Sequence, residues 1–319
     1  MNLEDKINRL KLKIKSNLDP LFVGIDSYLI TDLPYYSNIG DTLIWQGELE
    51  YLKSLNLNCL GSSSLQTFDF PSVPCSTAIL LQGGGNFGDL WRSSQLFRLK
   101  VISHYRDNKI ILFPQSIYYS KIDLAISDSK IFSKHNNLYL CVRDSASFHF
   151  LRKFFPNNKI LLVPDMAFYL SEQWLKPYRK LTDSKILYLK RKDKELISHN
   201  YQIYFDEVSD WPTLERHYTE TITMSLALRI HKYNFCSNQI TKYLCDTYAY
   251  RVYRPFLLNL GVNFLSSYSE IVTTRLHAMI LALLLHKKVY FIDNLSNKLS
   301  SFYKTWLSDL TDIKDISSH

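Results

Sequence analysis

An arginine and a histidine stand two positions apart at a strand–helix junction near the C-terminus. Residues 271–274 form a β-rich run that stops at Arg275, and an apolar, helix-like run follows His277 before a second strand-like run at 289–293. Open α/β sheets bind ligands at such junctions, beyond the carboxyl ends of their strands, and a helix start attracts anions. The pair is therefore a candidate site for an anionic substrate that must also receive a proton. A buried structural histidine and an arginine bonded to a strand-end carbonyl fit the same spacing.

Polar residues also follow other expected strands. Asp41, after Gly40, opens an expected helix, so it is either the helix cap, which the spacing favours, or a carboxylate able to take a proton from a hydroxyl. Arg143 ends a strand and suits a carboxylate or phosphate clamp, or pairs with Asp144 or Asp165. Lys190 and Arg191 end the first strand of the second half, as binding cations or as part of a solvated charge run.

Residues 82–89 are glycine-rich and lie between an expected strand and an expected helix. Gly83, Gly85 and Gly88 match the spacing of a dinucleotide-binding fingerprint. That fingerprint also requires an acidic residue about 20 positions on, at the end of the next strand. The next strand instead ends in 113–116, Phe-Pro-Gln-Ser, which disfavours NAD. What remains is a backbone that can approach a ligand closely.

Alternating strand-like and helix-like runs position these residues. Expected strands are 21–30, 77–82, 109–115, 138–143, 159–165 and 185–189, and expected helices are 41–55, 89–106, 121–132 and 146–155, with a mainly helical stretch at 213–265. This alternation predicts an α/β protein with mainly parallel sheets. The polar stretch 171–184 suggests a boundary between domains 1–175 and 176–319, with a cleft between them. A last helix, 300–310, is expected to cross back to the first domain.

Composition narrows the class of protein. The chain has 319 residues and a net charge of +8 (38 basic minus 30 acidic), spread along its length, which suits an anionic partner better than nucleic acid. Five cysteines without a CxxC pair, no apolar leader and no apolar run near the ~20 residues of a membrane span predict a cytoplasmic protein. Residues 3–18 form a basic amphipathic helix that either packs on the body, which we favour, or lies on a membrane.

Taken together, these motifs resemble the polysaccharide pyruvyl transferase family. The matching segments occur in family order from residue 38 to about 303, and their number and order carry the resemblance. A departure is 295–299, where the family more often has a Tyr-Gly-Lys-Asn-like sequence, although Lys298 aligns. The segments are Asn38-Ile39-Gly40-Asp41, Gly83–Gly85 with Asn86, Phe113-Pro114-Gln115-Ser116, Arg143-Asp144-Ser145-Ala146-Ser147, Val163-Pro164-Asp165, residues 190–195, Thr274-Arg275-Leu276-His277, and Ile292-Asp293-Asn294 with Lys298.

The resemblance implies a GT-B-like fold of two Rossmann-like domains, with the acceptor side in the first and the donor side in the second. It implies transfer of pyruvate from phosphoenolpyruvate to a sugar of a capsule, exopolysaccharide or cell-wall precursor, usually as a cyclic ketal. It implies phosphoenolpyruvate as donor substrate, no other cofactor, no metal, no nucleic acid, and a lipid-linked sugar acceptor with peripheral contact at the inner membrane face.

Residue roles follow from this chemistry. His277 is the expected carbon acid because its unperturbed pKa of ~6.5 lies near neutral pH. Asp41 is the expected base. The expected donor-binding residues are Arg275 and Arg143, with Lys190 and Arg191 across the cleft, and Asn294 and Lys298 from the C-terminal segments. The expected acceptor-side residues are Asn38, Gly84, Gly85 and Asn86.

Two other functions fit the same sequence. A GT-B glycosyltransferase with a nucleotide-sugar donor would share the architecture, because fold does not determine function. A non-catalytic protein that binds anionic glycan through its basic surface is the second alternative.

Overall fold

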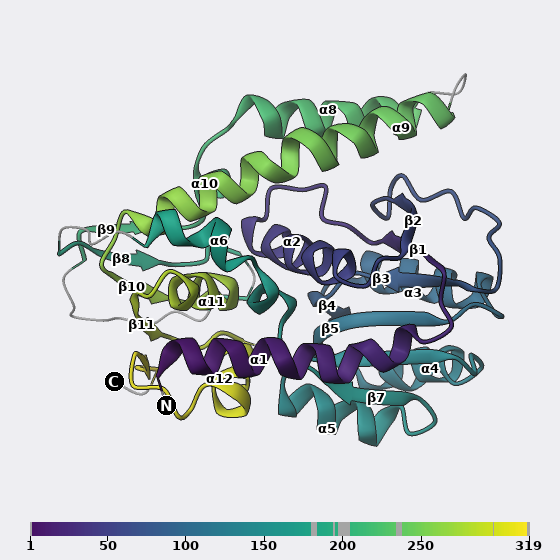
Figure 1. Ribbon diagram of the computed structural model, residues 1–319, viewed down its shortest axis with the longest axis horizontal. Helices are drawn as coiled ribbons and strands as arrows, with labels where there is room; N and C mark the ends of the chain where they lie inside the picture. Colours follow the sequence, from purple (N-terminus) through teal and green to yellow (C-terminus); the bar gives the residue numbers. More distant parts are fainter. Residues whose placement is uncertain are drawn as a thin grey trace.

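Two parallel β-sheets, one from each half of the sequence, organise the chain (Figure 1). The computed structural model describes residues 2–179, 184–193, 195–196, 205–233, 238–295 and 297–317. In the first, seven-stranded sheet every pairing is parallel. Its order is β2 (Asn58–Ser62), β1 (Ser27–Thr31), β3 (Thr77–Leu81), β5 (Ile110–Tyr118), β6 (Leu138–Val142) and β7 (Lys159–Leu162), with β4 (Gly84–Gly88) paired to β5.

The second sheet has five parallel strands. Its order is β12 (Ile313–Asp315), β11 (Lys288–Phe291), β10 (Glu270–Thr273), β8 (Ile186–Leu189) and β9 (Glu207–Ser209). The predicted α/β fold with mainly parallel sheets is confirmed. A parallel sheet with a layer of helices on each face is Rossmann-like.

Helices cover both faces of the first sheet, which is why the central strands are apolar throughout. Successive residues of β3 alternate between two cores: Ala78 and Leu80 face the side covered by α1 and α2, and Ile79 and Leu81 the side covered by α3 to α5. The helices of this half are α1 (Leu3–Leu18), α2 (Ile39–Lys53), α3 (Arg92–His104), α4 (Ile122–Phe132), α5 (Ser145–Phe154) and α6 (Glu172–Leu175), with 3₁₀ turns at Asp19–Phe22, Met166–Tyr169 and Lys176–Tyr178.

The second half adds a long helical excursion between β9 and β10, which Figure 1 shows in green above the first sheet. Gly261 lies in this excursion so close to Ile39 of α2 that an added Cβ would stand 2.4 Å from its Cγ2, so the two halves pack tightly here. The helices are α7 (Pro212–Glu215), α8 (Thr219–Tyr233), α9 (Asn238–Tyr248), a π-helical turn (Ala249–Tyr253), α10 (Arg254–Ser266), α11 (Leu276–Leu284) and α12 (Lys298–Trp306).

The basic N-terminal helix α1 packs on the body, the alternative that we favoured. Its apolar stripe, Ile7, Leu10, Ile14 and Leu18, is buried, and Lys6 pairs with Asp309 at 2.6 Å near the other end of the chain. The stripe is thus covered by protein. None of the described helices combines the length and apolarity that crossing a bilayer requires.

Helix α12, near the C-terminus of the chain, crosses back to contact residues that follow β6 in the first sheet. The Trp306 indole donates to the Arg143 carbonyl at 2.7 Å, and the Ser301 hydroxyl donates to Asp144 at 3.1 Å. The domain boundary at 175/176 stays a prediction, since part of the neighbouring segment lies outside the described residues.

Two local predictions were wrong, and three strands were missed. The first strand begins at Ser27 rather than residue 21, because Asp19–Phe22 form a 3₁₀ turn with Pro20 near its start. The glycine-rich segment is not a loop before a helix but the short strand β4, and Gly88 adopts φ +121° there, with no room for a Cβ beside the Tyr118 carbonyl. Strands β2, β9 and β12 are three to five residues long at sheet edges and were not predicted.

Candidate active site

A cleft of about 680 Å³ lies where the carboxyl ends of the two sheets meet. Arg143 follows β6, Arg191 follows β8, Asp210 follows β9 and Arg275 follows β10, so four strand ends contribute to its wall. This is the position at which open parallel sheets bind ligands. The lining residues are Tyr36, Ser37, Asn38, Asp41, Leu65, Gly85, Asn86, Trp91, Ser93, Ser94, Arg143, Arg191, Lys192, Asp193, Glu195, Asp210, Trp211, Leu214, Arg275, Leu276, His277, Asn294 and Lys298.

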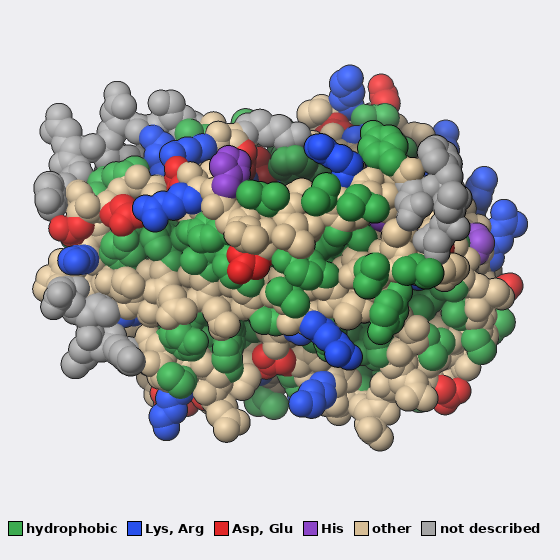
Figure 2. Space-filling view, turned by 90° about the horizontal axis from the view of Figure 1, so that it is seen from above, with side chains coloured by type: hydrophobic (Ala, Val, Ile, Leu, Met, Phe, Trp, Pro, Cys, Tyr) green, Lys and Arg blue, Asp and Glu red, His purple; other side chains and the backbone are tan. Residues whose placement is uncertain are grey.

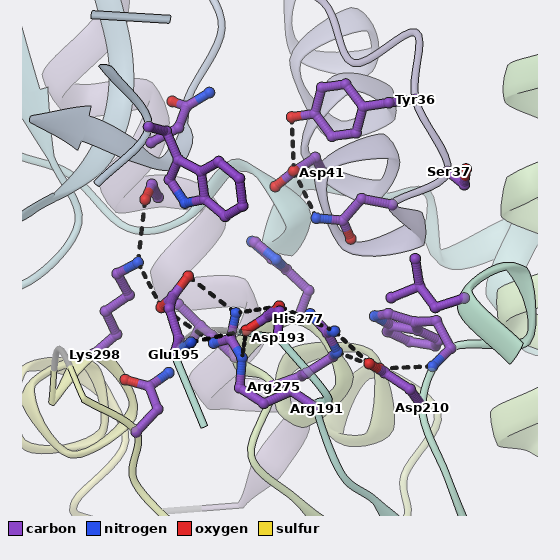
Figure 3. A pocket seen from close by; sticks show the side chains of 18 of the residues that line it. Tyr36, Ser37, Asp41, Arg191, Asp193, Glu195, Asp210, Arg275, His277 and Lys298 are labelled. Carbon is purple, nitrogen blue, oxygen red and sulfur yellow. Dashed lines mark hydrogen bonds and ion pairs between the residues drawn. The ribbon is translucent and has the colours of Figure 1, made fainter. Parts of the chain in front are cut away.

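His277 lies in the first turn of α11 and faces this cleft (Figure 3). Its Nε2 atom is 3.0 Å from Arg143 Nη1 and 3.4 Å from the Asp165 carboxylate, and Arg143 Nη1 donates to the same carboxylate at 2.6 Å. The Arg143 Nε donates to the Ser116 hydroxyl at 2.8 Å, which fixes the guanidinium. One imidazole nitrogen therefore faces a cation and an anion together.

The two contacts of His277 Nε2 require opposite protonation states. Arg143 can only donate, so its contact needs an unprotonated Nε2, whereas Asp165 can accept from Nε2 only when that atom carries a proton. Burial alone would raise the pKa of Asp165, but Arg143 and His277 outweigh it and hold this pKa below its usual range. Asp165 is thus a permanent carboxylate behind the imidazole, ready to stabilise its protonated form.

Gly40 supports the opposite side of the imidazole. A Cβ at this position would lie 2.8 Å from His277 Nδ1 and 3.0 Å from its Cβ, closer than such atoms pack. The start of α2 therefore touches the ring only because residue 40 is glycine. The position of His277 depends on both halves of the chain.

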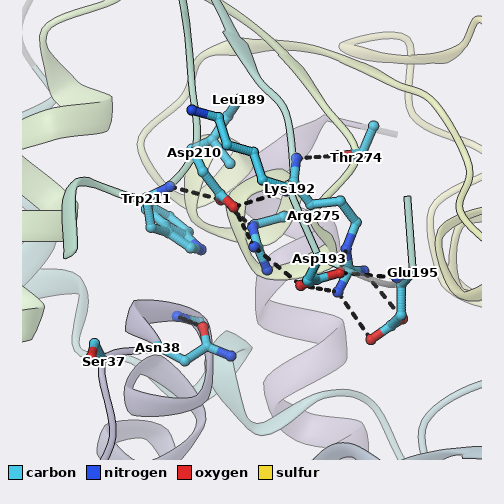
Figure 4. A network of polar contacts seen from close by, with 12 residues as sticks. Ser37, Asn38, Leu189, Lys192, Asp193, Glu195, Asp210, Trp211, Thr274 and Arg275 are labelled. Carbon is cyan, nitrogen blue, oxygen red and sulfur yellow. Dashed lines mark hydrogen bonds and ion pairs between the residues drawn. The ribbon is translucent and has the colours of Figure 1, made fainter. Parts of the chain in front are cut away.

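Arg275 is held by acidic residues of its own half (Figure 4). Its Nε and Nη2 contact both carboxylate oxygens of Asp210, the latter at 2.5 Å, and Nη2 also lies 3.4 Å from Asp193. Its backbone N–H donates to the Thr273 hydroxyl at 2.9 Å. Arg275 is itself the N-cap residue of α11, and no side chain caps this helix.

Arg191 and Lys298 form a second ion-pair group. Arg191 pairs with Asp193 at 2.8 Å and with Glu195 at 2.9 Å, and Lys298 Nζ lies 3.0 Å from Glu195 and 3.1 Å from the Gly85 carbonyl. Burial lowers the pKa of Lys298, which Glu195 partly opposes. Burial likewise disfavours the Glu195 carboxylate, but Lys298 and Arg191 prevail and lower its pKa. These cations now face the protein's own carboxylates.

Asp41 lies across the cleft from this group. Figure 3 shows its carboxylate on the far side of His277 from Asp193 and Glu195. The Tyr36 hydroxyl donates to it at 2.9 Å and the Asn38 amide at 2.7 Å. The helix cap is Asn38, whose side chain accepts from the Gly40 N–H at 3.0 Å, so the favoured assignment of Asp41 as the cap was wrong.

Comparison with known proteins identifies the family of this chain. The family model for polysaccharide pyruvyl transferase matches residues 38–297. The chain belongs to this family.

Two relatives and one solved structure extend this finding. "Putative pyruvyl transferase EpsO" of Bacillus subtilis is 30% identical over 309 residues, 96% of this chain and 93% of that protein. "Pyruvyl transferase 1" of Schizosaccharomyces pombe is 25% identical and matches 91% of this chain and 72% of that protein. The crystal structure of protein KP1_0663 from Klebsiella pneumoniae, described as functionally uncharacterised, aligns with a TM-score of 0.61 at 21% identity, over 96% of this chain and 98% of that one, which shows the shared fold.

Ten of the twelve site residues predicted from the sequence line the cleft of this pyruvyl transferase. Lys190 does not, because its ammonium lies over the Tyr188 ring, 5.8 Å from the ring centroid. Gly84 begins β4 beside Ile44 and is also absent from the lining. The others are His277, Asp41, Arg275, Arg143, Arg191, Asn38, Gly85, Asn86, Asn294 and Lys298.

One acidic partner in this site was anticipated from the sequence and the others were not. Asp165 was one of two aspartates expected as alternative partners of Arg143, and the structure confirms this pair at 2.6 Å, but the contact of Asp165 with His277 was not expected. Asp210 follows β9, a three-residue edge strand with too little pattern to predict, so no strand end was expected there. Asp193 and Glu195 alternate with basic residues and had been read as part of one charge run.

Proposed function

We propose that this pyruvyl transferase moves pyruvate from phosphoenolpyruvate to a sugar of a surface-polysaccharide precursor and forms a ketal. The observation that carries the proposal is the protonatable Nε2 of His277 beside Arg143, in a cleft that also holds Arg191, Arg275 and Lys298. Phosphoenolpyruvate has two anionic groups and a carbon that must be protonated, and this set of side chains matches both needs.

The first step is protonation of the donor. His277 Nε2 delivers a proton to the methylene carbon, C2 becomes electrophilic, and Asp165 stabilises the imidazolium before transfer. The donor carboxylate and phosphate bind Arg143, Arg191, Arg275 and Lys298. Because carboxylates of the protein occupy these cations, the donor exchanges places with some of them, Asp193 and Glu195 above all.

The second step joins the sugar. A sugar hydroxyl attacks C2 and gives its proton to Asp41, whose position opposite the cation groups supports this role. Phosphate then leaves with the bridging oxygen, a second hydroxyl attacks C2, and its proton goes to the phosphate. The methylene carbon has become a methyl group. Asp41 then releases its proton to solvent and His277 takes one up, so atoms and protons balance over the cycle.

The acceptor in this proposal is a lipid-linked precursor handled before export. Phosphoenolpyruvate is a cytoplasmic metabolite, so the reaction belongs to the cytoplasm. Trp91 and Trp211 line the same cleft as Asn38 and Asn86, and flat aromatic faces with polar neighbours suit a sugar.

Mass spectrometry of glycan precursors after incubation with phosphoenolpyruvate tests the reaction. The product should gain about 70 Da, the composition of pyruvate less water. His277→Ala should keep the fold and lose turnover, and Arg275→Ala should also weaken donor binding. Lys190→Ala is the matched control, because this lysine lies outside the cleft, and should keep full activity.

Thermal shift with phosphoenolpyruvate and with UDP- or GDP-sugars separates the donor classes. Stabilisation by phosphoenolpyruvate supports the proposal. Stabilisation by a nucleotide-sugar alone would show a glycosyltransferase instead. Glycan binding that is unchanged in His277→Ala, without any product, would indicate a binding protein.

A further inference from the structure

Helix α8 carries an apolar stripe that faces away from the protein. Ile222, Leu226, Ile230 and Tyr233 are 51–61% exposed, and their spacing of four, four and three residues aligns them on one side of the helix. Met224 and His231 are the buried residues of α8, and at 100° per residue they lie on the opposite side. The stripe is therefore not the surface by which α8 packs on the body.

Helix α9 repeats this arrangement. Ile240, Tyr243 and Leu244 are 57–67% exposed, on the side opposite the buried Cys245. The other side of α9 is fastened to the first half of the chain: Asp246 accepts from the Thr67 hydroxyl at 2.6 Å. Figure 2, which looks down on this hairpin, shows apolar side chains spread across the surface, with Lys and Arg side chains among and beside them.

The exposed charges on the two helices themselves are basic. Arg229 and Lys232 are exposed, whereas the acidic residues of α8 and α9, Glu220 and Asp246, are only partly exposed. Of the exposed acidic residues nearby, Glu215 pairs with Lys192 and Asp69 pairs with Lys242. Asp246 is held against Thr67 rather than turned outward. Exposed apolar side chains flanked by Arg and Lys are the signature of a helix that lies in the interface of an anionic bilayer.

We propose that the α8–α9 hairpin docks the enzyme on an anionic lipid bilayer, with the two apolar stripes inserted at the headgroup level. A second copy of the chain fits this surface less well. A two-fold interface would bring two copies of this surface together, and so gather Arg229 and Lys232 of both copies in one interface with few exposed acidic side chains to pair with them. Helix α1 cannot serve in its place, because its apolar stripe is buried in the body.

The docking surface adjoins the mouth of the cleft. Leu214 of α7, eight residues before Ile222 in the sequence, is 47% exposed and lines the cleft. Leu65 also lines the cleft, and it lies two residues from Thr67, which holds α9. A docked hairpin would thus bring the cleft to the membrane surface, where a lipid-linked sugar can enter. This last step rests on the proposed function, whereas the docking does not.

Vesicle co-sedimentation of the full-length protein tests the docking. Vesicles rich in phosphatidylglycerol should bind the protein, and vesicles of phosphatidylcholine alone should bind it at least about tenfold less. Leu226→Glu with Ile230→Glu, and separately Arg229→Glu with Lys232→Glu, should each reduce binding about tenfold or more. Leu12→Glu is the matched control, because Leu12 is an exposed leucine of α1 (66%), and should bind like the wild type.

The remaining outcomes each overturn the docking. They are no binding by the wild-type protein, binding unchanged in both hairpin variants, or loss only in Leu12→Glu. Sedimentation velocity adds a further one: a wild-type dimer that becomes a monomer in Leu226→Glu with Ile230→Glu would make the hairpin a contact between copies.

An activity arm separates this proposal from the proposed function. The hairpin variants should act normally on a water-soluble sugar acceptor and lose activity only on a lipid-linked acceptor in vesicles. If no acceptor is pyruvylated by any variant, the proposed function fails while the binding result still decides the docking.

Discussion

Replacing Gly40 by alanine should move the His277 imidazole, the proposed acid, without unfolding the protein. The new Cβ would stand 2.8 Å from His277 Nδ1, and ordinary contact begins at 3.4 Å, so the ring must retreat by 3.4 − 2.8 = 0.6 Å or more. The ring is backed by Arg143 and Asp165 on the side of Nε2, so it cannot retreat without disturbing these contacts.

The expected consequence is a loss of turnover rather than of stability. Misplacing a catalytic group by about 1 Å can cost roughly 100-fold in rate, so a shift of this size should lower kcat about tenfold or more. Overpacking costs about 1–3 kcal/mol, and alanine returns up to about 1 kcal/mol inside a helix, so the net loss in unfolding free energy should stay near 2 kcal/mol or less.

The assay is steady-state phosphate release with saturating donor and acceptor, alongside thermal unfolding. Gly61→Ala is the control: its Cβ would press on Leu29 Cδ2 at 3.2 Å, in a strand outside the cleft, and its kcat should match the wild type. The reasoning is refuted if Gly40→Ala keeps kcat within twofold of the wild type while a crystal structure shows the ring displaced.

Three further predictions concern buried charge. Burial raises the pKa of Glu48 well above its usual value, against the hydrogen bond from the Gly83 N–H, so the fold favours its neutral form. The contribution of Glu48 to stability is therefore present below about pH 4.3, where the unfolded chain is protonated, and falls as pH rises above it. Glu48→Gln should raise the melting temperature at pH 7 and have little effect at pH 4, and an equal effect at both would contradict this. Burial would raise the pKa of Asp165, but Arg143 and His277 lower it, so its contribution to folding stability is complete above about pH 3.9 and is lost as pH falls through the lower folded value. In urea titrations, Asp165→Asn should lose about 3–5 kcal/mol of unfolding free energy at pH 7 and less below pH 4. An equal loss at both pH values would contradict a buried ion pair at this position. Binding of phosphoenolpyruvate should be accompanied by proton uptake that disappears in His277→Asn, measured by calorimetry in buffers of different ionisation enthalpy; uptake that persists in the variant would assign the proton to another group.

Much of this architecture can be predicted from the sequence because the strands of a buried parallel sheet appear in it as short apolar runs. The buried runs of β3, β6 and β10 can be assigned as strands from their own residues alone. Because parallel strands end at the same edge of a sheet, the polar residues that follow them must meet at that edge. The prediction of the cleft from Arg143, Arg275 and His277 rested on this geometry.

Apart from the pair of Arg143 and Asp165, the sequence could not supply the pairing of charges. The partner of Arg275 is Asp210, 65 residues away and after a strand of three residues, so no local pattern announces it. Asp41 looked like a helix cap because only the three-dimensional contact of Asn38 with the Gly40 N–H reveals the true one. The apolar stripe of α8 was equally hidden, since periodicity shows that a helix is two-sided but not which side the body covers.

The balance of charge in the cleft constrains how the donor can bind. Arg143, Arg191, Lys192, Arg275 and Lys298 line it together with Asp41, Asp193, Glu195 and Asp210, so the lining carries only 5 − 4 = +1 with His277 neutral. A donor with several negative charges therefore cannot be held by surplus charge, as the net +8 of the whole chain would suggest. The donor that we propose would have to take over cations from the protein's own carboxylates. Among these cations Arg143 also lies 3.0 Å from His277 Nε2, so a donor bound to Arg143 would act on the imidazole as well.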